Sequence, residues 1–183
     1  MPDYRRARTK GGTYFFTVVT HRRQPILTDE PIRAALRESI ENTRKRLPFE
    51  IVAWVLLPDH LHCIWMLPDD DADFDKRWGM IKRQVSQACG LQYNLTEWQN
   101  ASRRSRNETS LWQRRYWEHQ IRDETDLTRH IEYIHWNPVK HSLVRQVSDW
   151  PYSTFHKYVA QGIYPMDWAG NLTEKKNETG FGE

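Results

Sequence analysis

Residues 50–67 read EIVAWVLLPDHLHCIWML, and this stretch decides the fold. Two apolar runs, Glu50–Leu57 and Leu61–Leu67, are joined through Pro58-Asp59 and predict a β-hairpin. Side chains in a strand alternate between the two faces of a sheet. The alternation predicts one face with His60, His62 and Ile64 and an opposite face with Leu61, Cys63 and Trp65.

The segment before this hairpin predicts a strand and a helix, and the segment after it predicts a second helix. Residues 13–20 are rich in β-branched and aromatic side chains and follow Gly11-Gly12, which indicates a first strand. A helix begins at Thr28 or Asp29, has Pro31 in its first turn, and ends at Pro48. An aspartate-rich loop begins at Asp69, and helical spacing follows it in Phe74, Trp78, Ile81, Val85 and Ala88.

The remaining elements complete a ferredoxin-like order. Residues 92–110 are polar and aperiodic and predict a loop, and residues 111–121 predict a last strand. A third helix begins at Asp123 or Thr125 and runs to Asn137, closed by Pro138, and Ser153 caps a short helix to about Gln161. We therefore predict an α+β, ferredoxin-like βαββαβ antiparallel sheet with helices on one face, plus an appended helix and a C-terminal extension. Residues 1–170 form one domain, and residues 171–183 are expected to be a disordered tail.

Composition indicates a reduced intracellular protein that contacts nucleic acid. The 183 residues carry a net charge of +3, two cysteines in apolar segments, and no run long enough to span a membrane, which predicts a cytoplasmic protein. Arginine is concentrated in blocks, and nine tryptophans and eight tyrosines accompany it. Guanidinium and aromatic planes suit phosphates and unpaired bases, although charge runs can also be solvated faces and tryptophans can be core.

The two histidines of the hairpin are candidate metal ligands. In a strand, His60 and His62 project to the same face with Cα atoms roughly 7 Å apart, a spacing that suits two ligands on one ion. The alternative interpretation is a packed or hydrogen-bonded pair without metal.

The third predicted helix carries a candidate nucleophile. Leu127, Ile131 and Ile134 set its expected core direction, and Tyr133 and Asn137 share one flank, one turn apart. If that flank docks on the histidine-bearing sheet, the Asn137 amide oxygen becomes a third ligand and the Tyr133 phenol faces whatever the metal holds.

Two imidazoles and one amide oxygen leave coordination positions open for water and a phosphate oxygen. The metal, Mg²⁺ or Mn²⁺, would polarise a phosphodiester while the phenol attacks phosphorus. A free phenol has a pKa near 10, so Lys140 or the metal would have to favour the phenolate.

Three motifs resemble a known family. The stretches LLPDHLHCIW (56–65), WQRRYWEHQIRDE (112–124) and HIEYIHWNPVKHSLV (130–144) resemble the one-tyrosine HUH transposases, and closely the REP-associated tyrosine transposases of bacteria. The likeness extends from residue 4 to residue 159. It implies a single-strand DNA endonuclease that cuts near palindromic hairpins, forms a 5′-phosphotyrosine bond and leaves a free 3′-hydroxyl.

The resemblance implies a role for each matched residue. His60 and His62 match the metal histidines, Tyr133 the nucleophile and Asn137 the polar third ligand, a position usually held by glutamine in the wider family. It further implies DNA contacts by the basic start, the Arg114-Arg115 segment and separate phosphate-binding cations. These residues are Arg5, Arg6, Lys10, Gly11, Gly12, Lys82, Arg83, Arg114, Arg115 and Lys140.

Alternatives remain open from the sequence. Tyr116 is a rival nucleophile, disfavoured because it lies in a predicted strand without a ligand one turn away. A nonenzymatic hairpin-binding protein, or a metal hydrolase that uses water on a small phosphoester, would share the same fold. The expected partners are single-stranded DNA and DNA hairpins, with the protein a monomer or a homodimer.

Overall fold

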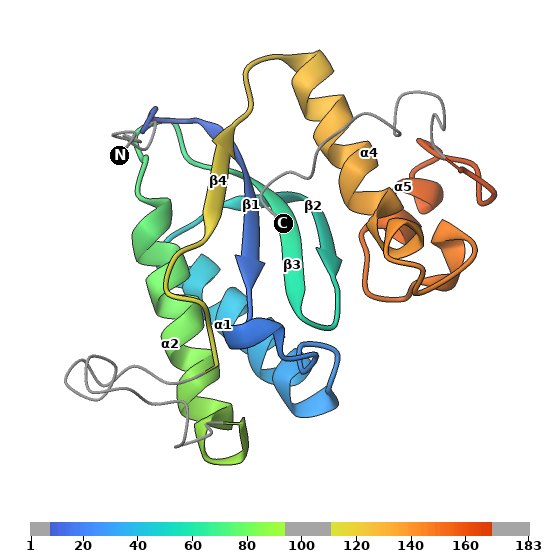
Figure 1. The fold of residues 1–183 in the computed structure, drawn as a ribbon. Coiled ribbons are helices and arrows are strands. Elements are labelled where there is room, and N and C mark those ends of the chain that lie inside the picture. The colour runs from blue at the N-terminus through green and yellow to red at the C-terminus, as the bar shows by residue number, and fades with distance from the viewer. Residues whose placement is uncertain (1–7, 94–110, 170–183) are drawn as a thin grey trace, which may run out of the picture.

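A four-stranded antiparallel sheet organises the protein (Figure 1). The computed structural model describes residues 8–93 and 111–169. The strand order is β2 (Glu50–Leu56), β3 (His60–Met66), β1 (Thr13–Val19) and β4 (Trp117–Gln120). This order, with every neighbouring pair antiparallel, confirms the predicted ferredoxin-like α+β sheet.

Two helices, α1 (Glu30–Arg46) and α2 (Phe74–Tyr93), cover one face of the sheet. The core beneath them is apolar and strongly aromatic. Trp65 of β3 stacks on Trp78 of α2, with ring centroids 4.2 Å apart, and packs at the same distance against Phe49. Leu61, Cys63 and Trp65 belong to this core, as the strand alternation predicts.

The other face of the sheet carries a third helix, α4 (Glu124–Lys140). Its apolar cluster is smaller and includes Phe15, Val55, Ile64 and Ile134. The side chain of Asp123 accepts from the Asp126 backbone N–H at 2.8 Å, so Asp123 is the N-cap and Thr125 lies inside the helix.

Shorter elements connect and follow these layers. They are the 3-10 helices η1 (His21–Arg23) and η3 (Val147–Asp149), and the helix α5 (Phe155–Ala160). In α5 the N-cap is Thr154 rather than the predicted Ser153, although Ser153 Oγ accepts from the Phe155 N–H at 3.1 Å. Within residues 8–93 and 111–169, no helix combines the length and apolar character needed to cross a bilayer.

The predicted hairpin is confirmed to within about one residue at each end. The turn from Leu57 to Asp59 is closed by a hydrogen bond from the Leu57 N–H to the His60 carbonyl at 2.9 Å. His60 therefore opens β3. Across to β1, His62 lies opposite Thr17 and His60 opposite Val19.

The last strand is shorter than predicted, with four residues in place of 111–121. Before this strand, Trp112 forms only an isolated bridge to Thr20. At Thr20, β1 has ended, and the chain then turns through positive φ at Arg22 and Arg23. Tyr116, expected within a strand, precedes β4, and its hydroxyl donates to Asp75 of α2. The pairing is interrupted because this segment packs toward α2.

Two helix ends also differ from the prediction. Helix α2 includes Gln92 and Tyr93, whereas the rest of the expected loop, 94–110, lies outside the described residues. Pro138 does not close α4, which continues to Lys140. Proline so near a C-terminus removes only one hydrogen bond, and the end is closed by N–H donors of His141 and Leu143 to the carbonyls of Asn137 and Pro138.

Candidate metal and nucleophile site

Strand β3 places two histidines on the face covered by α4. His60 is 1% exposed and His62 is fully buried. Their ring centroids lie 4.9 Å apart, with the ring planes at 82°. The shared face follows directly from the strand alternation, and the prediction that both imidazoles project the same way is confirmed.

The Nδ1 atom of each imidazole has a hydrogen-bond partner. His60 Nδ1 donates to Asp59 Oδ1 at 2.7 Å, and His62 Nδ1 pairs with Thr17 Oγ1 at 2.9 Å. These bonds fix the orientation of each ring and turn Nε2 to the opposite side. A carboxylate behind a histidine is a usual arrangement around a metal-binding imidazole. The Thr17 hydroxyl takes the corresponding position behind His62.

Asp59 stays ionised behind His60. Burial raises the pKa of Asp59, but hydrogen bonds and charges from His60 and Arg23 outweigh that effect and lower it to about 2. Arg23 donates to the second carboxylate oxygen at 2.9 Å. The imidazole therefore has an anionic partner throughout the neutral pH range.

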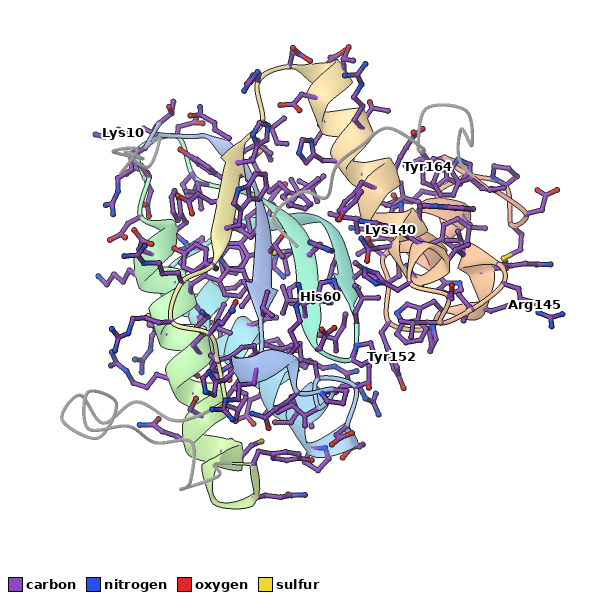
Figure 2. The ribbon with its side chains drawn as sticks, viewed as in Figure 1. Lys10, His60, Lys140, Arg145, Tyr152 and Tyr164 are labelled. Carbon is purple, nitrogen blue, oxygen red and sulfur yellow. The ribbon has the colours of Figure 1, made fainter. Side chains whose placement is uncertain are left out.

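Tyr133 of α4 packs directly on this pair. Its ring centroid lies 5.2 Å from that of His62, and the side chain is 6% exposed. Lys140 donates from Nζ to the Tyr133 hydroxyl at 3.2 Å and lies 4.8 Å from the ring centroid. Figure 2 shows Lys140 at the end of α4, near the strand that carries His60. A cation at this distance favours the phenolate form of a tyrosine.

Asn137 lies one turn after Tyr133 and is fully buried. Its Oδ1 atom, like the Nε2 atoms of His60 and His62, is buried. Two neutral imidazoles and an amide oxygen form a donor set that suits manganese and later divalent ions and can accept magnesium. The residues present therefore fit a divalent metal.

The buried stripe of α4 differs from the expected one. The buried residues of α4 are His130, Tyr133, Ile134, His135, Asn137 and Pro138, whereas Leu127 and Ile131 are only partly buried. Two of its polar side chains contact histidines of the sheet, since Tyr133 packs on His62 and His130 stacks on His119. Of the three apolar residues expected to set the core direction, Ile134 alone is fully buried.

The predicted DNA-contacting residues are widely spread. Arg5 and Arg6 lie outside the described residues, whereas Lys10, Arg83, Arg114, Arg115 and Lys140 are exposed. Gly11 and Gly12 have a structural reason for being glycine, since Gly11 has a φ of +68° and a Cβ on Gly12 would lie 2.6 Å from the Tyr14 ring.

Lys82 and Arg83, adjacent on α2, differ in their surroundings. Lys82 donates to the Gln113 carbonyl at 2.9 Å and lies over the rings of Trp112 and Tyr116. Arg83 lines an open groove of about 1040 Å³ between α1 and α2, together with Lys45, Arg46 and Lys76. Both lie on the helical layer, across the sheet from His62.

Tyr116, the rival nucleophile, lies on the opposite side of the sheet. Its ring packs against the core under α1 and α2, near Phe16 and Trp78. The tyrosine that packs against the histidine pair is Tyr133.

Sequence reasoning missed several partners of the site. Asp59 is the immediate neighbour of His60, so a carboxylate–histidine pair could have been suspected from the sequence. Thr17 required the β1–β3 register, and His141, whose ring lies 5.1 Å from His60, required the end of α4 to be placed.

Comparisons with known proteins show the family of the chain. The model of the family described as "Transposase IS200 like" matches residues 9–137, which run from just before β1 to the last turn of α4. The chain belongs to the IS200-like transposase family. It is therefore an enzyme of the DNA strand transferase class.

Close relatives cover nearly the whole chain. A REP-associated tyrosine transposase of Escherichia coli K12 is 49% identical over 175 residues, which is 95% of this chain and 94% of the relative. A putative REP-associated tyrosine transposase of Haemophilus influenzae Rd is 44% identical over 174 residues, or 93% of this chain and 95% of the relative.

A solved structure shares the fold. The structure of a REP-associated tyrosine transposase bound to a REP hairpin is 47% identical and superposes with a TM-score of 0.83, covering 100% of this chain and 98% of the other. The resemblance to REP-associated tyrosine transposases is confirmed.

Proposed function

We propose that this transposase is a metal-dependent single-strand DNA endonuclease and strand transferase that acts at REP-type DNA hairpins. The observation that carries the proposal is the position of Tyr133, whose ring lies 5.2 Å from that of His62 and whose hydroxyl lies 3.2 Å from Lys140 Nζ. The relatives are named for REP elements, and one was solved with a REP hairpin.

His60, His62 and Asn137 are the proposed ligands of the divalent ion, Mg²⁺ or Mn²⁺. When bound, the ion supplies Lewis acidity to a phosphate oxygen, which stabilises the charge that builds up during the displacement. Asp59 and Thr17 hold the two imidazoles so that Nε2 faces the ion.

Tyr133 is the proposed nucleophile. Its phenolate oxygen attacks phosphorus, the bond between phosphorus and the 3′ oxygen breaks, and the departing oxygen takes up a proton to become a free 3′-hydroxyl. The product is a 5′-phosphotyrosine. Because one phosphate ester replaces another, a 3′-hydroxyl can reverse the reaction and rejoin DNA without a nucleotide cofactor.

DNA binding rests on the basic and aromatic surface. We propose that the N-terminal residues up to Gly12 and the Arg114-Arg115 segment contact the hairpin, and that Lys82, Arg83 and Lys140 contact phosphates. Tyr133 packs on His62 of the same chain, so a monomer can supply the whole site. Cys63 and Cys89 are buried free thiols, which suits action in the reducing cytoplasm.

The test is covalent capture on a labelled hairpin that carries a single-stranded flank. With Mn²⁺, the wild-type chain should gain a DNA adduct that resists denaturation. Tyr133→Phe should still bind the hairpin but lose the adduct by more than about a thousandfold, because no hydroxyl remains to attack. Tyr116→Phe is the matched control and should form the adduct.

Three outcomes would contradict the proposal. An adduct on Tyr133→Phe at the wild-type rate would show that another group is the nucleophile. Binding without any adduct in the wild-type chain would indicate a nonenzymatic hairpin-binding protein, and strand cleavage that is indifferent to Tyr133 would indicate a hydrolase that uses water.

A further inference from the structure

A second group of metal-ligating side chains lies on the α4 face of the sheet, toward β4. His119 of β4 and Asp126 and His130 of α4 each offer one ligand atom, and all three atoms lie within 4.8 Å of one another. His119 Nε2 donates to Asp126 Oδ2 at 2.8 Å, and His130 Nδ1 lies 3.1 Å from Asp126 Oδ1. Each carboxylate oxygen thus faces one imidazole.

Backbone hydrogen bonds hold the carboxylate in place. Asp126 occupies the first turn of α4, where its N–H donates to the N-cap Asp123. Its Oδ2 also accepts from the Arg122 N–H at 3.0 Å. A carboxylate oriented in this way is an organised ligand.

The two imidazoles are positioned by aromatic packing. Their ring centroids lie 4.7 Å apart, close to the 4.9 Å between His60 and His62. Trp117 lies parallel to His119 at 5.9 Å, and Phe15 packs on His130 at 4.9 Å. His130 is buried, whereas the side chains of His119 and Asp126 are 21% and 20% exposed, so water and ions can reach the group from one side.

We propose that His119, Asp126 and His130 bind a second divalent transition-metal ion, with zinc the best fit. Two imidazole nitrogens and one carboxylate are a common three-ligand set for zinc, and water completes the coordination. Binding replaces the hydrogen bond from His130 Nδ1 to the Asp126 carbonyl and that from His119 Nε2 to Oδ2. The proton of each neutral imidazole moves to the other ring nitrogen, so each histidine stays neutral.

This group is separate from the His60–His62 pair. Phe15 packs against both, with its ring 4.9 Å from His130 and 5.4 Å from His62. The ion would join β4 to the first half of α4, and His130 lies one turn before Tyr133. The role of this ion is to hold the helix that presents Tyr133, and it needs no contact with DNA.

Metal stoichiometry tests the proposal on the full chain without DNA. Equilibrium dialysis against Zn²⁺, followed by elemental analysis, should find one more equivalent in the wild-type chain than in His119→Phe, which keeps a ring beside Trp117. Asp126→Asn keeps the side-chain shape and should also lose that equivalent. The exposed His156→Ala is the matched control and should bind as the wild type does.

Variants separate the two groups. The double variant His60→Ala/His62→Ala should retain the zinc held by His119, Asp126 and His130, and adding His119→Phe should remove it. Co²⁺ should give visible absorption bands from this double variant and raise its melting temperature, and both effects should vanish with His119→Phe.

Equal zinc content in the wild type, His119→Phe and Asp126→Asn would overturn the proposal. So would a double variant that binds no zinc while its melting temperature without metal matches the wild type. If instead His60→Ala/His62→Ala binds as much zinc as the wild-type chain, and His119→Phe removes all of it, the result would contradict the proposed function and leave the second site intact.

Discussion

The sheet face under α1 and α2 is packed with apolar side chains, whereas the face under α4 buries histidines, a threonine and an asparagine among fewer apolar ones. Adjacent residues of β3 divide between the two, since Trp65 enters the apolar core and Ile64 and His62 face α4. Burying apolar area stabilises a fold, whereas burying polar groups costs free energy unless they find partners. The apolar face therefore carries most of the stability, and the polar face is organised for chemistry.

The largest expected effect tests the apolar face. Trp65→Ala removes a ring that stacks on Trp78 and packs on Phe49, and should lower the free energy of unfolding by about 3–5 kcal/mol. Urea unfolding measures the change. Met66→Ala, at the exposed next position, should change it by less than about 0.5 kcal/mol. A loss under about 1 kcal/mol for Trp65→Ala would mean that this core is not the main source of stability.

His62→Ala tests the polar face, where we expect a large loss of activity and a smaller loss of stability. Adduct formation with the hairpin should fall at least about a hundredfold, because one proposed ligand and the ring that packs on Tyr133 are lost. The free energy of unfolding should fall less than in Trp65→Ala. A variant that unfolds as readily as Trp65→Ala but forms the adduct at the wild-type rate would reverse the division between the faces.

Lys140→Met measures the contribution of the cation beside Tyr133. Removing the ammonium group should lower the phenolate fraction and slow adduct formation about tenfold at neutral pH. The deficit should narrow as pH rises, since hydroxide then ionises the phenol without help. The exposed Lys157→Met serves as control. If Lys140 acted only as a phosphate contact, hairpin affinity would drop and the rate at saturating DNA would stay unchanged.

Gly79→Ala is the smallest expected effect and concerns the outer surface of the helical layer. Nothing lies within 4 Å of a Cβ built at Gly79, and alanine is the better helix former, so the free energy of unfolding should rise by about 0.5–1 kcal/mol. Gly12→Ala should be destabilising, because its Cβ would meet Tyr14. Thermal unfolding of both variants checks the pair, and a destabilised Gly79→Ala would contradict the expectation.

The apolar face was also the more predictable one. Period-two alternation in β3 and the helical spacing of Phe74, Trp78, Ile81 and Val85 predict which residues pack together, and the structure places these in one core. Ala88, the last member of the predicted stripe, is exposed. The ferredoxin-like order follows from these patterns, as does the placement of His60 and His62 on one face.

The polar face was harder to predict because its contacts are long-range. The buried side of α4 carries His130, Tyr133 and Asn137. The spacing of the apolar residues predicts instead that Leu127 and Ile131 are buried. Thr17 reaches His62 only through strand register, and Asp126 reaches His119 only across the β4–α4 connection. Residues 114–116 are not paired in the sheet because Tyr116 packs toward α2. This contact is long-range, so the local sequence pattern does not predict it.

The central claim is that the Tyr133 phenol and the imidazoles of His60 and His62 meet at one metal-bound phosphate. The most direct measurement is ¹⁹F NMR of 3-fluorotyrosine placed at position 133, titrated with paramagnetic Mn²⁺ in an Asp126→Asn background. The account predicts that stoichiometric Mn²⁺ broadens this resonance beyond detection and that His60→Ala/His62→Ala restores it. A sharp Tyr133 signal with Mn²⁺ bound through His60 and His62 would contradict the account.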